Sequence, residues 1–187
     1  MKISISGVQS SGKTTLIQEL IKLPIFENYH VHESPTRTLY KEFDIKFDTG
    51  NTDIQLSTLA LQLYHLNQYE NAIFDRAVID NLAYYLYHKH RHNSNMSKES
   101  EYFMYKMSHE FMKQIDIIFM LNPEFPIITD GVRNTDEIQR KEVVDILKTV
   151  ILREYNYGEI RYLSGSIDNR VKQVVDYIGR EKHEQGT

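Results

Sequence analysis

Two patterns of hydrophobic residues, one typical of strands and one of helices, alternate along the chain, and together they predict its fold. Short apolar segments bounded by polar residues or glycine are typical of β-strands, and they occupy residues 2–6, 29–33, 72–74, 115–121 and 160–163. Between them, apolar side chains recur at the three- and four-residue spacing of a helix face in residues 14–22, 53–69, 78–87, 98–114, 136–155 and 168–178. Strands that alternate with helices long enough to cross back over a sheet indicate an α/β fold with parallel strands.

The run Ile117–Leu121 is apolar at every position, which is typical of a central strand covered by helices on both faces. We therefore expect a doubly wound sheet of five parallel strands with helices on both sides. No glycine- or serine-rich linker divides the sequence, so residues 1–187 are interpreted as one domain. The polar segments 43–51 and 88–97 are expected to form exposed loops.

Composition excludes several classes of protein. The 187 residues include no cysteine, which excludes disulfide scaffolds, thiolate metal sites and cysteine nucleophiles and is compatible with a reducing compartment. A formal net charge of −4 does not favour a protein that coats nucleic acid or acidic membranes, although a local basic site stays open. No apolar run approaches the roughly 18 to 20 residues that span a bilayer, and the first residues lack a signal peptide's hydrophobic stretch. We therefore expect a cytoplasmic protein.

The most informative segment is GVQSSGKT, residues 7–14, which matches the phosphate-loop pattern G-x-x-x-x-G-K-[ST] between a predicted strand and a predicted helix. Gly7 and Gly12 permit backbone conformations in which successive amides point at phosphate oxygens. Lys13 would reach the β and γ phosphates of ATP, and the Thr14 hydroxyl would ligate Mg²⁺. The residues expected to contact ATP in this segment are Gly7, Gln9, Ser10, Ser11, Gly12, Lys13, Thr14 and Thr15.

A charge pair, Asp75 and Arg76, follows the predicted strand 72–74. In a parallel sheet this is the carboxyl edge, where ligands bind and where the phosphate loop also lies. Asp75 could position Mg²⁺ through its water shell or accept a proton from an attacking hydroxyl, and Arg76 could clamp a phosphate. The alternative is a surface ion pair at the end of a strand.

A resemblance supports the catalytic interpretation of this pair. The segment FDRAVIDNLAYY, residues 74–85, is similar to the D-R-x-x-x-[SD]-x-x-A-Y element of thymidylate kinases and related deoxynucleoside kinases. The matched positions include Asp75, Arg76 and Tyr84, and the resemblance implies that they are catalytic or bind substrate. The residues after Arg76 differ from a strict D-R-[YS] motif, so the resemblance does not assign the substrate.

Glu33 ends the second predicted strand, and Arg37 follows it closely. Pro35 between them favours an extended or turning path. Glu33 could receive the proton of a sugar hydroxyl; with a monophosphate acceptor it would instead bind the sugar while Arg37 holds the phosphate. A solvated strand end is an equally weighted alternative.

A lid at about residues 126–140 follows the fourth predicted strand and precedes a long helix. It carries Arg133 and Arg140, which could close over the transferring phosphoryl group, unless both are simply exposed on a charged helix. After the fifth strand, Gly165 and Ser166 could hold adenine through backbone groups, and Arg170 could cover its ring. The same turn needs no ligand if Ser166 only caps the next helix.

Three segments in order, GVQSSGKTTL, DGVRNTDEIQRKEVVDILKTVILREY and YLSGSIDNRVKQVVDYI, resemble the NadR-like P-loop kinase family, which is AAA-type. The resemblance spans about four-fifths of the chain when the Asp75 region is included. It implies the P-loop NTPase fold of nucleoside and nucleotide kinases with a short lid. It departs at Asp75 and Arg76, where the deoxynucleotide-kinase pattern fits better.

We therefore predict an ATP- and Mg²⁺-dependent phosphotransferase acting on a small nucleoside-type acceptor. A (deoxy)nucleoside monophosphate is preferred, because Arg37 and Arg76 supply cations for an acceptor phosphate. The alternatives are a nicotinamide riboside (nucleoside) kinase, a polynucleotide or modified-base DNA kinase, and a nucleotide-dependent switch or ATPase. The oligomeric state is left open, with a homodimer as one alternative.

Overall fold

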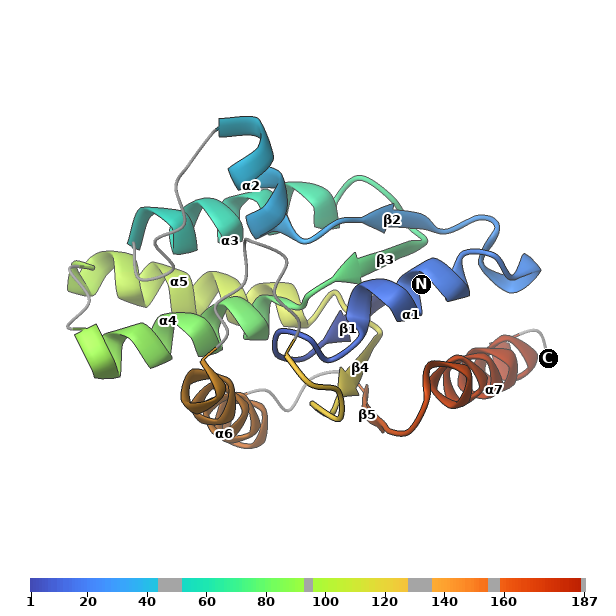
Figure 1. Ribbon diagram of the computed structural model, residues 1–187. Coiled ribbons are helices and arrows are strands. Elements are labelled where there is room, and N and C mark those ends of the chain that lie inside the picture. The colour runs from blue at the N-terminus through green and yellow to red at the C-terminus, as the bar shows by residue number, and fades with distance from the viewer. Residues whose placement is uncertain (44–51, 93–95, 128–135, 155–158, 186–187) are drawn as a thin grey trace.

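A computed structural model describes residues 1–43, 52–92, 96–127, 136–154 and 159–185. Its five strands form one parallel sheet in the order β2-β3-β1-β4-β5 (Figure 1). The strands are β1 (Lys2–Ser6), β2 (His30–His32), β3 (Ala72–Asp75), β4 (Ile117–Leu121) and β5 (Glu159–Leu163). The expected five-stranded parallel α/β sheet is confirmed.

The helices cover both faces of this sheet. They are α1 (Lys13–Leu20), α2 (Pro35–Phe43), α3 (Thr52–Leu66), α4 (Val78–His92), α5 (Lys98–Met112), α6 (Glu137–Glu154) and α7 (Ile167–Gln185), with a short 3₁₀ turn at Pro24–Phe26. Figure 1 shows α1 and α7 on one side of the sheet and α3, α4, α5 and α6 on the other. Within the described residues, no helix is both long enough and apolar enough to cross a membrane.

Side-chain alternation along the strands assigns each strand face to one of these helical layers. Ile3 and Ile5 of β1 are fully buried in the core under α1 and α7. Ser4 and Ser6, on the opposite face, are equally buried and lie toward the other layer. β4 is apolar on both faces, as expected for a covered strand, and it lies between the central strand β1 and β5.

The parallel arrangement places the functional segments at one edge. The loop after β1 leads into α1, β3 ends at Asp75, and β4 leads into residues 122–127. Because β3 and β4 both pair with β1, these three segments emerge next to one another at the carboxyl ends of their strands.

Two segments differ from the sequence-based expectation. Residues after Glu33 form helix α2, whose first residue is Pro35. Proline fits the first helical turn because its missing amide would have no helical partner there, so it starts a helix rather than an extended path. Helix α4 continues to His92, and His88 is only 5% exposed, so the expectation of an exposed loop from residue 88 was wrong. Residues 44–51 lie outside the described residues.

A group of stacked rings joins β2 to the C-terminal end of α3. The His32 ring stacks on His65 at 4.3 Å and on Phe74 at 5.0 Å between centroids, and His30 stacks on Tyr69 at 3.9 Å. Burial lowers the pKa of His32 to about 4, with further lowering from His65 and His30. His32 is therefore mainly neutral in the folded protein above about pH 4.

This burial makes folding stability depend on pH. An unfolded histidine takes up a proton near pH 6.5, whereas folded His32 resists protonation until about pH 4, so the contribution is complete above pH 6.5 and lost as pH falls toward 4. We expect His32→Phe to remove about 2 kcal/mol of the decrease in unfolding free energy between pH 7 and pH 4.5, measured by urea titration. Exposed His90, changed to Phe, is the control, and equal pH dependence in both variants would contradict the assignment.

Candidate active site

The phosphate loop has a backbone that few residues other than glycine tolerate. Gly7 has φ +138° and Gly12 has φ +89°. A Cβ atom at Gly7 would lie 2.8 Å from the carbonyl oxygen of Leu121, so the loop packs directly against the end of β4. Ser10 also has a positive φ, +54°. The loop therefore adopts the left-handed conformations that turn successive amides to one side.

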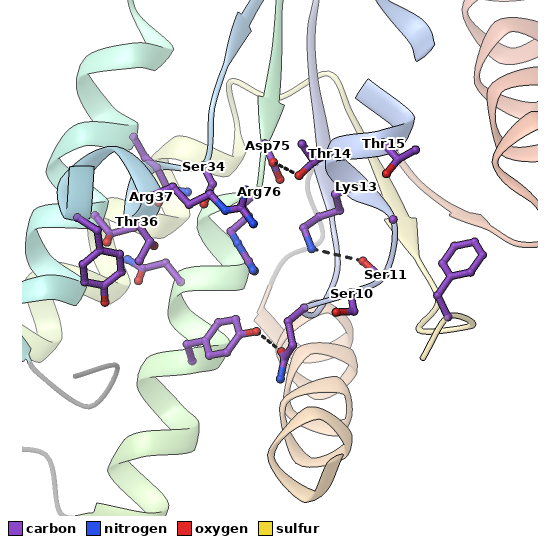
Figure 2. Close-up of a pocket in the computed structure, with 18 of the residues that line it drawn as sticks. Ser10, Ser11, Lys13, Thr14, Thr15, Ser34, Thr36, Arg37, Asp75 and Arg76 are labelled. Atoms are coloured by element: carbon purple, nitrogen blue, oxygen red, sulfur yellow. Dashed lines mark hydrogen bonds between the residues drawn. The ribbon is translucent and has the colours of Figure 1, made fainter. Parts of the chain in front are cut away.

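Lys13 folds over the loop from the first turn of α1. Its ammonium donates hydrogen bonds to the carbonyl oxygens of Gly7 and Val8, both at 2.7 Å, and to the Ser11 hydroxyl at 3.3 Å. The side chain is buried, and Figure 2 shows it directed toward Ser11 along the inner side of the loop. This places a cation beside the loop amides, where a phosphate group would lie.

The Thr14 hydroxyl donates a hydrogen bond of 3.0 Å to Oδ2 of Asp75 (Figure 2). The other carboxylate oxygen, Oδ1, is buried and accepts no hydrogen bond from the described residues. A hydroxyl beside a carboxylate with an unsatisfied oxygen is an oxygen donor set suited to Mg²⁺. Thr14 and Asp75 thus fit the metal-binding role expected from the sequence, with Asp75 acting directly or through a water.

Arg76 holds a strained backbone conformation, with φ +95°. Such a conformation costs on the order of 1 to 3 kcal/mol in a non-glycine residue, so its surroundings must fix it. The guanidinium donates to the Gly7 carbonyl at 3.4 Å and lies 5.3 Å from the centre of the Tyr84 ring. Burial alone would lower the pKa of Arg76, but Tyr84, Asp80 and Asp75 together raise it, so the group stays cationic.

Asp80 joins the start of the phosphate loop to the start of α4, a role that sequence reasoning missed. Its carboxylate accepts hydrogen bonds from the Ser6 hydroxyl at 2.6 Å and from the amides of Gly7 and Ala77, both at 2.9 Å. Arg76 lies 3.7 Å from the same carboxylate. Asp80 occupies the [SD] position of the motif that includes Asp75 and Arg76, which was the signal that could have identified it.

Gln9 connects the phosphate loop to α4. The Tyr84 hydroxyl donates a hydrogen bond of 2.6 Å to Oε1 of Gln9. The Nε2 group of Gln9 is buried and has no partner among the described residues. Tyr84 thereby fixes a loop side chain as well as contacting Arg76, which explains its position in the motif.

Most of these side chains, though not that of Asp80, line one cavity of about 310 Å³. Its first part is formed by the phosphate loop with Phe125 and Ile167, and its second part by the start of α2, one face of α3 and the start of α4 (Figure 2). Arg37 and Arg76 lie opposite the phosphate loop in this view. The described residues that line the cavity are Gln9, Ser10, Ser11, Gly12, Lys13, Thr14, Thr15, Ser34, Thr36, Arg37, Tyr40, Ile54, Gln55, Thr58, Gln62, Asp75, Arg76, Asn81, Tyr84, Phe125, Pro126, Gln139 and Ile167.

The second part of the cavity contains a polar row that sequence reasoning missed. Gln55, Thr58 and Gln62 share one face of α3, and each is more than nine-tenths buried. The Thr58 hydroxyl and Oε1 of Gln62 accept or donate no hydrogen bond within the described residues. The signal available in the sequence was a set of polar residues at helical spacing, at positions where a helix that packs on the core usually has apolar residues. Such a row can hydrogen-bond a polar ligand.

Several other residues predicted for the site do not line the cavity. Glu33 is exposed at the end of β2 and does not line it. Arg140 is buried and donates to the carbonyl of Phe125 at 2.7 Å, so it holds a lining residue instead of lining the cavity itself. Gly165 and Ser166 form the turn before α7, outside the lining set, and Ser166 accepts a hydrogen bond from the Asn169 amide at 3.3 Å as a helix cap. Arg133 lies outside the described residues.

Comparison with known proteins identifies the family. A family model described as an AAA domain, AAA_28, matches residues 2–170. The chain belongs to this AAA domain family. A comparison by sequence with curated proteins gives no match.

Solved structures of kinases share the fold of this chain. Deoxyadenosine kinase from M. mycoides with bound dATP has a TM-score of 0.68 and 15% identity, covering 96% of this chain and 99% of that one. The same kinase with the products dCMP and dCDP gives 0.62 and 18%, with the same coverage. NadR in complex with NAD and AMP-PNP gives 0.67 and 18% over 95% of this chain and 49% of NadR, so this AAA domain spans about half of NadR. The expected likeness to NadR-like P-loop kinases is confirmed.

The contacts of Asp80 predict a large cost for removing its charge. Asp80→Asn keeps the side chain's shape but places an amide group against two backbone amides and a hydroxyl, leaving buried donors unsatisfied. We expect the free energy of unfolding to fall by about 2 to 4 kcal/mol, which corresponds to a decrease of roughly 5 to 10 °C in the melting temperature measured by calorimetry. The control is Asp116→Asn, because the exposed Asp116 also accepts a backbone amide, at 2.6 Å. Equal losses in the two variants would contradict the role given to Asp80.

Proposed function

We propose that this AAA domain is an ATP- and Mg²⁺-dependent kinase that transfers a phosphoryl group to a small nucleoside-type acceptor, with a (deoxy)nucleoside monophosphate preferred. The observation that carries this proposal is the single cavity joining the phosphate loop to a second, polar part lined by Arg37, Arg76 and α3. A switch or simple ATPase needs the first part only, whereas a transferase needs room for two substrates.

The charges in the cavity favour an acceptor that already carries a phosphate. Asp75 is the one carboxylate among the described residues that line it, and its Oδ2 is bonded to Thr14. A nucleoside hydroxyl needs a base to remove its proton, but Glu33, the other candidate, is exposed outside the lining set. A monophosphate needs no strong base and does need cations, which Arg37 and Arg76 supply.

Catalysis in this arrangement comes from alignment and neutralisation of charge. The loop amides and Lys13 would hold the β and γ phosphates of ATP, while Arg76 would face the group in transfer from the acceptor side. Mg²⁺ held by Thr14 and Asp75 would neutralise charge on the phosphate oxygens. The polar row Gln55, Thr58 and Gln62 would bind the remaining part of the acceptor.

A nucleoside kinase is the second candidate. It is supported by the name of a fold relative, deoxyadenosine kinase, and by the likeness to NadR. Because of the likeness to NadR, nicotinamide riboside is one of the acceptors to test. In that case Asp75 would have to act as the base as well as lying at the metal site.

A panel of acceptors separates these functions. Release of ADP is measured with Mg·ATP and deoxynucleosides, their monophosphates, nicotinamide riboside, or an oligonucleotide, with Lys13→Ala as the inactive control. We expect at least about tenfold faster turnover with one deoxynucleoside monophosphate than with its nucleoside. Preference for an unphosphorylated nucleoside would support the second candidate. ADP release that ignores every acceptor would overturn the kinase assignment.

The role of Arg37 predicts a selective defect. Arg37→Gln should raise the KM for the monophosphate acceptor by at least about tenfold through the loss of a charge-assisted phosphate contact, with the KM for ATP within about twofold of the wild type. Arg37 is exposed on α2, so its replacement should leave the fold intact. Lys41→Gln, an exposed change of the same charge on the same helix, is the matched control and should alter neither value. A parallel loss of ATP affinity would place Arg37 elsewhere in the mechanism.

A further inference from the structure

Arg170, in the first turn of α7, is the one charged side chain among the largest fully buried residues of the described chain. Burying a guanidinium is costly unless its donors are satisfied. The structure places it behind the phosphate loop, outside the lining set of the cavity, where it cannot cover an adenine ring. The expectation that Arg170 stacks on a base was therefore wrong, and its burial needs another explanation.

The contacts of Arg170 reach three separate segments. Nη1 donates to the carbonyl of Ser11 in the phosphate loop at 2.6 Å, and Nε donates to the carbonyl of Gly165 at 2.9 Å. Nη2 donates to the carbonyl of Asn122, after β4, at 3.3 Å and to the carboxylate of Glu124 at 3.0 Å. One planar group therefore ties the loop after β1, the segment after β4 and the turn after β5.

Glu124 and Phe125 extend this connection. Oε2 of Glu124 also accepts the amide of Gly165 at 2.7 Å, and these two contacts, the amide first and Arg170 second, lower the pKa of Glu124. The ring of Phe125 lies 4.8 Å from the guanidinium. A Cβ atom at Gly12 would lie 3.0 Å from the same ring, and Phe125 lines the cavity. The apolar wall beside the phosphate loop is thus set by the same group.

We propose that Arg170 is a positioning residue for the donor nucleotide: it holds the phosphate loop and the cavity wall at Phe125 in one fixed arrangement, so that the phosphates of ATP and the rest of the nucleotide bind together. This inference rests on the proposed function, because it takes ATP as the ligand. Arg170 itself touches no substrate in this arrangement.

The physical basis is the rigidity of the connection. Two subsites held at a fixed separation bind a ligand that spans them more tightly than two subsites that move independently, because less ordering is needed on binding. Engaging the Ser11 carbonyl behind the loop also keeps that oxygen away from the phosphates while the amides stay available. Lysine cannot replace this geometry, since an ammonium lacks the planar fork that reaches three segments.

A purely structural role and a positioning role predict different ligand behaviour. If Arg170 only stabilises the fold, its replacement lowers the melting temperature but leaves folded molecules with unchanged ligand preference. If it positions the two subsites, replacement selectively reduces the advantage of ATP, which spans both, over tripolyphosphate, which occupies the phosphate loop alone. The ratio of the two dissociation constants is therefore the decisive quantity.

The experiment measures binding of Mg·ATP and of Mg·tripolyphosphate by calorimetry, with KM values for ATP and for the acceptor. Arg170→Lys is the main variant. Glu124→Gln is the second variant, because Glu124 is exposed and its replacement should fold. Arg180→Lys is the matched control, since Arg180 is exposed on the same helix. All proteins are compared at a temperature where each is folded by circular dichroism.

We expect Arg170→Lys to reduce the ratio of the tripolyphosphate to the ATP dissociation constant at least about fivefold and to raise the KM for ATP, with the acceptor KM within about twofold. Glu124→Gln should change the ratio in the same direction and Arg180→Lys should not. An unchanged ratio in folded Arg170→Lys, or in Glu124→Gln if the first variant does not fold, would overturn the inference while the kinase assignment stands. Wild-type protein that binds neither ligand would overturn the proposed function first.

Discussion

The site depends on one constraint: the phosphate loop must hold its carbonyl oxygens away from the ligand while its amides stay available. Lys13 and Arg76, which line the cavity, donate to the loop carbonyls of Gly7 and Val8, and Arg170, which does not line it, donates to the carbonyl of Ser11. Asp80 fixes the entry of the loop through the Gly7 amide. Positive backbone φ angles are unfavourable by themselves, so this loop conformation is maintained by its neighbours.

The topology of the sheet explains why these neighbours are available. β1 lies between β3 and β4, so the loop after β1 is flanked by the Asp75–Arg76 pair on one side and by the segment after β4 on the other. Helix α4 begins two residues after Arg76, which brings Asp80 back to the loop in its first turn. A parallel sheet thus gathers, at one edge, the groups proposed to contact metal, phosphate and acceptor, which come from distant parts of the sequence.

Local features, such as strands and the phosphate loop, could be predicted from the sequence, whereas side-chain contacts between distant segments could not. The five strands, the phosphate loop and the Asp75–Arg76 pair were evident because glycine placement and apolar runs report local backbone conformation. Helix α2 was missed because Pro35 fits both a turn and a first helical turn. The partners of Asp80 and Arg170 depend on contacts across 73 and 159 residues of sequence, which no local pattern encodes. Arg170 was assigned to the cavity because its burial could not be known.

The charge distribution bears on the size of the acceptor. The described residues that line the cavity include three cations, Lys13, Arg37 and Arg76, against the single carboxylate of Asp75, whereas the chain as a whole has a formal net charge of −4. A short-range cationic site within a negative molecule attracts a small anion that enters it, but repels a long polyanion whose phosphates extend over the outer surface. The combination therefore favours a mononucleotide over a nucleic-acid strand, because only the smaller molecule places all of its charge inside the cavity.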